Sequence, residues 1–342
     1  MPTLLSVQYL RALAAFAVAA FHTLQWARID FDIGAAGVDV FFVISGFIMW
    51  RTTEGRETRP LEFLRRRAIR IVPLYWTVTL GLAAAALLWP ARFTDVQPTW
   101  DHVLQSLAFI QHRNPAGLPF PILAPGWTLN YEAVFYLIFA ACLLIPRASR
   151  LLVLTCVLMA LGFGGFFHPP AYEMLANPMI LEFLAGVLWA KAMNTGVSPG
   201  RGAGWAIFGA GLAWYITMYF TQAEWDLWRP LFWGFPALLL VIGLTSVEAD
   251  GGLLDLAPLR TLGDASYSLY LTHPLVIGAM AVSFGVWHVW FVPVALGLAC
   301  AVGWLSWRFF ERPITDRLKG PLPDATSPDH TDSQRRASDT AN

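Results

Sequence analysis

The sequence predicts an all-α protein that crosses a membrane about ten times. Of its 342 residues, 56% are hydrophobic and only 13% are charged, and the mean hydropathy is +0.53. A soluble domain of this length is nearer a quarter charged, so the composition is typical of a polytopic membrane protein. Basic and acidic residues number 23 each, so the net charge points to no partner such as nucleic acid.

Ten apolar segments are expected to form helical spans, since about 20 such residues cross ~30 Å of hydrocarbon. They are residues 4–26, 36–51, 70–89, 128–146, 150–167, 176–194, 203–221, 230–247, 264–284 and 289–310. The stretch His102–Gln111 is too short and polar to span, and we expect a loop or an interfacial helix there. The sequence therefore predicts a transmembrane domain over 1–317 and, because large apolar side chains are almost absent beyond it, a disordered cytoplasmic tail over 318–342.

The basic residues predict the orientation of these spans. Between the second and third spans lies the densest basic cluster of the sequence: Arg51, Arg56, Arg59, Arg65, Arg66, Arg67 and Arg70. This loop is expected in the cytoplasm, and an even number of spans then places both termini there. Gln8 and Arg11 interrupt the first apolar segment, and no clear small-residue cleavage site follows it, so no cleaved signal peptide is predicted.

Several enzyme classes lack their usual signatures here. Cys142, Cys156 and Cys300 fall in apolar runs without CxxC spacing or nearby histidines. They are interpreted as small buried side chains rather than a disulfide or zinc set, and no metal site is expected. The sequence contains no GxGxxG, Walker A, HExxH or GxSxG motif.

Arg11 and His22 both lie in the first expected span. Eleven residues turn a helix by about 1100°, three turns plus about 20°, and raise it by about 16 Å. The two side chains therefore share a face, Arg11 in the inner half of the membrane and His22 near its outer surface. Charged residues inside lipid usually line a cavity or pathway. The alternatives are a snorkelling arginine and a packing histidine.

Asp39 and Glu132 lie near the outer ends of the second and fourth expected spans, at about the depth of His22. A carboxylate beside a histidine can hold its tautomer and raise its basicity, as a general base requires. Alternatively, Asp39 caps its helix and Glu132 is a first-turn acid favoured by the helix dipole. In the ninth span, His273 either bonds across helices or takes part in catalysis.

Arg67 and Arg70 are spaced i, i+3 where the third expected span begins, so they project together. Guanidinium forks bind phosphate in bidentate geometry, and Arg11 extends this positive zone inward. The alternative is that the arginines anchor the helix to anionic lipid and set topology, as we expect of Arg65 and Arg66. The layout suits a donor held from the cytoplasm by its phosphates, with its reactive end reaching toward an acceptor on the far side.

At these residues the sequence resembles the acyltransferase family 3 of bacterial integral-membrane O-acyltransferases, most closely its exopolysaccharide acetyltransferase members. The matching pieces follow one another in order along most of the chain: "SVQYLRALAAFAVAAFH" with R-x10-H spacing, "GVDVFFVISGFIM", "RRRAIRIVPLYW" with RxxR, "WTLNYEAVFY", "SYSLYLTHPLV" and "WRFFERP". The combination is specific, whereas R-x10-H alone is weak.

The resemblance implies transfer of an acetyl or other short acyl group from cytoplasmic acyl-CoA to a sugar hydroxyl of an exopolysaccharide or its lipid-linked precursor. It makes His22 and Arg11 the paired functional residues, places Arg67 and Arg70 near the CoA phosphates, and puts Glu132 in the family's W-x-L-x-x-E pattern. Asp39 completes the set of catalytic candidates. The expected surroundings are the bacterial inner membrane, with membrane lipid, a glycan acceptor and polysaccharide-assembly proteins as partners.

Two other classes of function remain open at this point. A transporter or flippase for acyl groups or glycolipids also needs intramembrane arginine, histidine and acids, although the sequence has no convincing inverted halves. A noncatalytic membrane scaffold leaves the buried polar set unexplained. Release of free CoA from acetyl-CoA that depends on a glycan acceptor distinguishes the enzyme.

Overall fold

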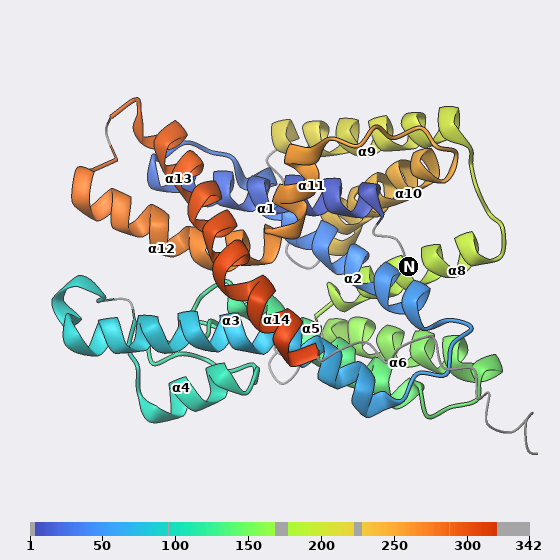
Figure 1. Ribbon diagram of the computed structural model, residues 1–342, viewed down its shortest axis with the longest axis horizontal. Coiled ribbons are helices and arrows are strands. Elements are labelled where there is room, and N and C mark those ends of the chain that lie inside the picture. The colour runs from blue at the N-terminus through green and yellow to red at the C-terminus, as the bar shows by residue number, and fades with distance from the viewer. Residues whose placement is uncertain (1–3, 95, 168–176, 222–227, 287, 320–342) are drawn as a thin grey trace, which may run out of the picture.

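The computed structural model describes residues 4–94, 96–167, 177–221, 228–286 and 288–319, and these residues contain helices and no strand (Figure 1). The α-helices are α1 (Leu5–Trp26), α2 (Gly37–Thr53), α3 (Pro60–Leu88), α4 (Trp100–Leu107), α5 (Gly126–Cys142), α6 (Arg147–Phe167), α8 (Ile180–Asn194), α9 (Arg201–Thr221), α10 (Phe235–Ala249), α11 (Ala257–Asp264), α12 (Ser266–Phe284), α13 (Phe291–Ser306) and α14 (Arg312–Lys319). Shorter 3₁₀ and π segments are η1 (Asp32–Ala36), η2 (Pro90–Arg92), η4 (Pro230–Gly234) and η5 (Trp307–Glu311).

Each of the ten expected spans contains a helix, which confirms the all-α polytopic class. Within the described ranges, seven helical segments are long and apolar enough to cross a membrane: Leu5–Trp26, Asp32–Thr53, Pro60–Leu88, Arg147–Gly164, Pro230–Ala249, Ser266–Phe284 and Phe291–Lys319. The other three expected spans correspond to α5, α8 and α9. The polar stretch after residue 100 contains the short helix α4, as predicted.

The third expected span begins earlier than the sequence predicts. The helix α3 starts at Pro60 instead of residue 70, so the arginines from Arg65 to Arg70 are helical and do not belong to a loop. Proline is favoured at a first helical position, where its missing N–H has no helical partner to lose. Glu62 pairs with Arg65 at 3.7 Å and with Arg66 at 2.7 Å. These polar contacts support helical turns that an apolar window does not include.

The centre of the bundle is formed by α1 and α2. In the most apolar stretch of α1, 61% of the residues are buried, and in that of η1 with α2, 78% are buried. The corresponding share in α6 is 17%. The helix α1 contacts α2, α10, α11, α12 and α13, while α3 runs along the side of the molecule away from α9 and α10 (Figure 1). Most residues of α1 and α2 therefore face other helices.

Close packing of α2 against α8 depends on two glycines. A Cβ atom at Gly46 would lie 1.9 Å from the carbonyl oxygen of Phe183, and one at Gly186 would lie 1.9 Å from that of Val43. Small residues let helix backbones approach in this way inside membranes. Phe42 and Phe183 stack beside this contact, with ring centroids 4.5 Å apart.

At the C-terminal end, helix continues slightly beyond the predicted domain boundary. The helix α13 leads through η5 into α14, which ends at Lys319. A difference of this size is within the usual uncertainty of helix ends. The rest of the expected disordered tail, residues 320–342, lies outside the described residues.

Candidate functional site

A cavity of about 180 Å³ lies between α1, α2, α3, α5 and α12. Its wall combines apolar side chains with several polar ones contributed by all five helices. The polar lining residues are Arg11, Ser45, Arg67, Arg70, Thr128, Glu132, Tyr136, Tyr267 and Tyr270. Concave sites of this kind, mostly apolar with a few convergent polar groups, are typical of ligand binding.

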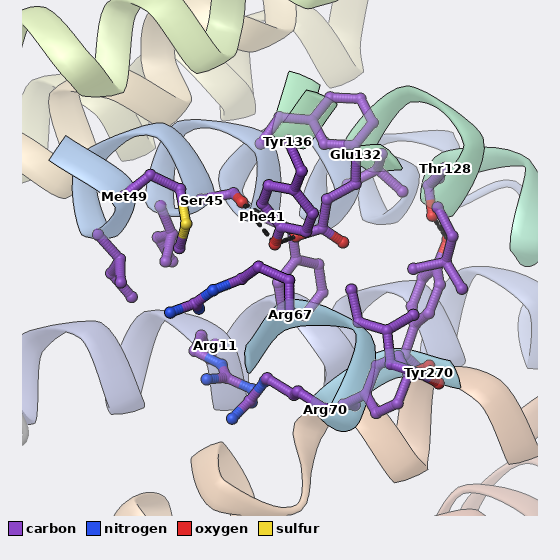
Figure 2. A pocket seen from close by; sticks show the side chains of 17 residues that line it. Arg11, Phe41, Ser45, Met49, Arg67, Arg70, Thr128, Glu132, Tyr136 and Tyr270 are labelled. Atoms are coloured by element: carbon purple, nitrogen blue, oxygen red, sulfur yellow. Dashed lines mark hydrogen bonds between the residues drawn. The ribbon is translucent and has the colours of Figure 1, made fainter. Parts of the chain in front are cut away.

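Three arginines gather on one side of this cavity (Figure 2). The guanidinium of Arg11 donates to Ser266 Oγ from Nε at 3.2 Å and from Nη2 at 2.9 Å. The guanidinium of Arg67 lies 5.7 Å from the ring centroid of Phe63, and its buried Nε has no hydrogen-bond partner. Arg70 follows Arg67 by about one helical turn on α3. The structure therefore brings together the three arginines that the sequence predicts to form one positive zone.

Their charge is not neutralised by ion pairs. In the part of the chain that the structure describes, none of the ion pairs involves Arg11, Arg67 or Arg70. All three side chains are half-buried, and charges drawn out of water are normally paired, because their desolvation is costly. Guanidinium groups that face a cavity with donors to spare are suited to an anion with several oxygen acceptors, such as a phosphate.

Glu132 lies on the opposite wall of the same cavity (Figure 2). Its Oε1 accepts a hydrogen bond from Ser45 Oγ at 2.9 Å and another from the hydroxyl of Tyr136, one turn further along α5. The two hydroxyls are themselves 3.3 Å apart. The sequence predicts Glu132 at the level of His22, but these hydroxyl groups hold it across from the arginines.

Asp39 belongs to a different cluster. Its carboxylate, which is fully buried, accepts hydrogen bonds from Arg229 Nε at 3.0 Å and from Arg229 Nη2 at 2.8 Å. The contact that the structure gives Asp39 is therefore with Arg229, whereas the sequence offered a place beside His22 or a helix cap. Glu182 of α8 lies next to this pair, and both of its buried carboxylate oxygens lack a hydrogen-bond partner.

Glu182 and Arg229 are not among the residues predicted from the sequence. Glu182 is an acid within the apolar segment "ILEFLAGVLW", and this exception to the local pattern was the available signal. Arg229 gave none, because it falls between the expected spans 203–221 and 230–247, where a basic residue is ordinary. Only the packing of η4 against α2 and α8 brings it to Asp39.

His22 and Arg11 share a face of α1, as the helical repeat predicts, because both contact α12. The ring of His22 stacks on that of His273 of α12, with ring centroids 5.2 Å apart. Arg11 donates a hydrogen bond to Ser266, which is also on α12. His22 does not line the arginine cavity. The layout predicted from the sequence has the reactive end of the donor reaching from the arginines toward the far side. One cavity lined by both Arg11 and His22 does not provide this path, because side chains of α12 lie between the two residues.

The side chains of Tyr270 and His273 lie between the arginine cavity and His22. Tyr270 lines the cavity, its ring centroid is 6.0 Å from that of His273, and it packs edge-on to Phe41 at 5.8 Å. Its hydroxyl lies 3.0 Å from Thr128 Oγ1 and donates to the carbonyl oxygen of Pro125 at 3.2 Å. A chain of contacting rings thus leads from the arginine cavity to His22.

Metal binding and disulfide chemistry receive no support from the described residues. They contain no group of three or more histidine, cysteine, aspartate or glutamate side chains arranged to hold a metal ion. The three cysteines are free; Cys142 is buried, Cys300 is half-buried and Cys156 is exposed. The prediction that all three are buried is thus wrong for Cys156, which lies on the outward face of α6.

Comparison with known proteins identifies the family. The family model described as "Acyltransferase domain" matches residues 4–308 of the chain. The chain belongs to acyltransferase family 3. This membership confirms the family resemblance found in the sequence, and the matched range includes every residue of the cavity and the His22–His273 stack.

Three relatives illustrate how far the similarity of this acyltransferase extends. It is 39% identical to the exopolysaccharide production protein ExoZ of Rhizobium meliloti, over 87% of this chain and 94% of the relative. It is 27% identical to the acyltransferase MdmB of Streptomyces mycarofaciens, over 95% of both chains. It is 24% identical to the peptidoglycan O-acetyltransferase OatA of Listeria monocytogenes, over 90% of this chain and 55% of the relative. No solved structure matches it.

Proposed function

We propose that this protein is a membrane O-acyltransferase that moves an acetyl or other short acyl group from cytoplasmic acyl-CoA to a sugar hydroxyl of an exopolysaccharide or its lipid-linked precursor. The observation that carries this proposal is a group of three arginines that face a cavity inside an acyltransferase bundle and form no ion pair in the described part of the chain. The name of the Rhizobium meliloti relative supports the acceptor class.

The arginine side of the cavity is the donor site in this proposal. CoA carries phosphate groups, and guanidinium forks match phosphate oxygens in charge and geometry. Arg67 has a buried donor to spare, and Arg11 and Arg70 lie beside it. The basic residues in the first turns of α3 support a cytoplasmic position for this end of the bundle. Both termini are then cytoplasmic, and the membrane is the bacterial inner membrane.

His22 is the general base in this proposal. Its imidazole takes the proton of the acceptor hydroxyl as the hydroxyl oxygen attacks the thioester carbonyl carbon. The carbon–sulfur bond then breaks, and the proton passes from the imidazolium to the departing thiolate. The products are a sugar ester and CoA with a free thiol, with no net gain or loss of protons.

The reaction requires the acyl group to pass from the arginine cavity to His22. Tyr270 closes the cavity on that side through its bonds to Thr128 and the Pro125 carbonyl, so its side chain has to rotate during transfer. Glu132 accepts hydrogen bonds from the Ser45 and Tyr136 hydroxyls, and these bonds fix the wall of the cavity against which the donor lies. Asp39 supports α2 through Arg229, and we assign it no part in the chemistry.

Purified protein, acetyl-CoA and polysaccharide from cells that lack this protein provide the test. We expect release of CoA thiol that depends on the polysaccharide, together with new acetyl esters on it. His22→Ala is expected to abolish both while the protein still inserts in the membrane. The matched control is His288→Ala, because His288 is exposed, its ring stacks on Trp290, and it does not line the cavity.

Three results would contradict the proposal. Release of CoA thiol at the same rate with and without the polysaccharide indicates a different acceptor. Unchanged acetylation in His22→Ala removes this histidine as the base. Movement of acyl groups or glycolipid across vesicles without thiol release indicates a transporter or flippase instead.

A further inference from the structure

His273 is a fully buried histidine whose tautomer is fixed by its surroundings. Its exposed fraction is 0%, and its Nδ1 lies 3.2 Å from the carbonyl oxygen of Leu269, one turn earlier on α12. A carbonyl oxygen only accepts hydrogen bonds, so Nδ1 carries the proton. The other nitrogen, Nε2, therefore presents a lone pair.

That lone pair has no partner in the protein. Nε2 is buried and makes no hydrogen bond. The great majority of buried polar atoms are paired, and an exception calls for a specific explanation, such as a catalytic role or an unseen water molecule. An acceptor atom held in a fixed direction is ready for a hydroxyl or N–H donor that arrives with a substrate.

The position of His273 favours a substrate over a purely structural role. It lies between His22, at 5.2 Å, and the cavity-lining Tyr270, at 6.0 Å, measured between ring centroids. Any acyl group that leaves the arginine cavity for His22 passes beside this ring. His22 itself is partly exposed, so an acceptor can approach the pair from that side.

We propose that His273 is a second acceptor-binding residue, whose Nε2 accepts a hydrogen bond from one hydroxyl of the sugar next to the hydroxyl that His22 deprotonates. This inference rests on the function proposed above. It predicts an acceptor with neighbouring hydroxyl groups, because the two imidazole rings are in contact and each interacts with one hydroxyl group. No bond forms or breaks at His273, and its ring stays neutral throughout.

Two substitutions separate this role from a structural one. His273→Gln places an amide oxygen near the position of Nε2 and lacks a donor at Nδ1. His273→Asn keeps an amide N–H near the position of Nδ1, able to bond the Leu269 carbonyl, and lacks an acceptor at Nε2. Both variants are expressed in cells that lack this protein, and acetyl esters on the extracellular polysaccharide are measured against the wild type. Thermal transitions of the detergent-purified proteins report on folding.

We expect His273→Asn to lose at least about tenfold in acetylation and His273→Gln to keep at least about a third, since loss of one substrate hydrogen bond typically has an effect of this size. Equal activity of both variants and the wild type would overturn the inference. Higher acetylation by His273→Asn than by His273→Gln would also overturn it, because the hydrogen bond to the Leu269 carbonyl would then be the important feature. If both variants fall together, the acceptor KM decides: a raised value supports the hydroxyl contact, and an unchanged value overturns it.

Failure of the underlying function is distinguishable. If the wild-type protein adds no ester to the polysaccharide relative to an empty vector, the proposed acyltransferase activity fails, and the inference fails with it. If the wild type is active and only the order of the two variants is reversed, the acyltransferase stands and His273 returns to a packing role.

Discussion

Two clusters of charged side chains within the described part of the bundle differ in balance and in packing. The arginine cluster, Arg11, Arg67 and Arg70, faces a cavity of about 180 Å³, and Glu132 is the one acid among the residues that line it. Glu311 and Asp264 lie near Arg11 and Arg70 outside this lining and form no ion pair with them in the described residues. The acidic cluster, Asp39 and Glu182 with Arg229, has two carboxyls for one guanidinium. Figure 2 shows the first arranged around open space.

The acidic cluster is closely packed. A Cβ atom at Gly234 would lie 2.8 Å from the Cγ of Glu182, so the backbone of η4 presses directly on this side chain. Arg229 also lies 4.5 Å from the ring centroid of Trp233, which covers the guanidinium. The comparison shows that charge within the membrane does not by itself identify a binding site. The proposed donor site rests on a second feature, a void beside arginines that form no ion pair in the described residues.

Arg229→Met offers the strongest test of the acidic cluster as a structural unit. It leaves Asp39 buried without its partner, and breaking a buried ion pair from one side is expected to destabilise by about 3–5 kcal/mol. The measurement is the free energy of unfolding in detergent micelles. Adding Asp39→Asn to the same protein should recover most of the loss, since no uncompensated charge then remains. A single variant as stable as the wild type would show that the pair is not structural.

Arg67→Ala combined with Arg70→Ala tests the arginine cavity as a donor site. Each charge-assisted hydrogen bond to a phosphate contributes about 1.5–3 kcal/mol, so acyl-CoA affinity should fall about a hundredfold or more. Equilibrium binding of acetyl-CoA measures it. The matched control is Arg65→Ala with Arg66→Ala on the same helix, since these side chains are 52% and 62% exposed and pair with Glu62. If the two double variants have the same acetyl-CoA affinity, Arg67 and Arg70 have no specific role in binding the donor. All four arginines are then interpreted as topology anchors.

Glu54→Gln examines a third contact, which joins α2 to α8 at the end opposite Asp39. Lys191 Nζ donates to Glu54 Oε1 at 2.6 Å, and Asn194 donates to Oε2. Burial raises the pKa of Glu54, but these hydrogen bonds and the Lys191 charge outweigh it and hold that pKa below its ordinary value. The resulting stability is present above the ordinary pKa and is lost as pH falls through the lowered one.

Because this pair is partly exposed, Glu54→Gln is expected to lower the free energy of unfolding at neutral pH by no more than about 1 kcal/mol. The difference between variant and wild type should shrink as the pH is taken below the lowered pKa. Unfolding midpoints in detergent at several pH values provide the measurement. A difference that stays constant across this range would show that the charge of Glu54 is not the source of the stability.

Glu182→Gln should have the smallest effect. The substitution preserves the shape of the side chain and replaces one of two buried carboxyl oxygens that have no hydrogen-bond partner among the described residues. We expect the free energy of unfolding to change by no more than about 0.5 kcal/mol, the range of a neutral substitution. Glu182→Ala is the companion variant, which leaves a void and should cost more. If Glu182→Gln destabilises as much as Glu182→Ala, the carboxylate charge itself is needed.

Much of the fold follows from local sequence alone. Apolar length predicts where the helices lie, because hydrocarbon thickness sets the number of residues in a span. The helical repeat predicts that Arg11 and His22 share a face and that Arg67 and Arg70 project together, and the structure confirms both. The early start of α3 is the exception, because polar i, i+4 pairs support helix without adding hydropathy.

The sequence by itself determined the helices, their polar faces and the family. Only the tertiary structure decided which polar faces meet. The partners Asp39 and Arg229 are separated by 190 residues, and Glu132 is held by Ser45 across 87. A helical pattern specifies the direction of a side chain relative to its own axis, whereas its partner depends on how neighbouring helices pack, through contacts such as Gly46 against Phe183 that involve residues far apart in the chain.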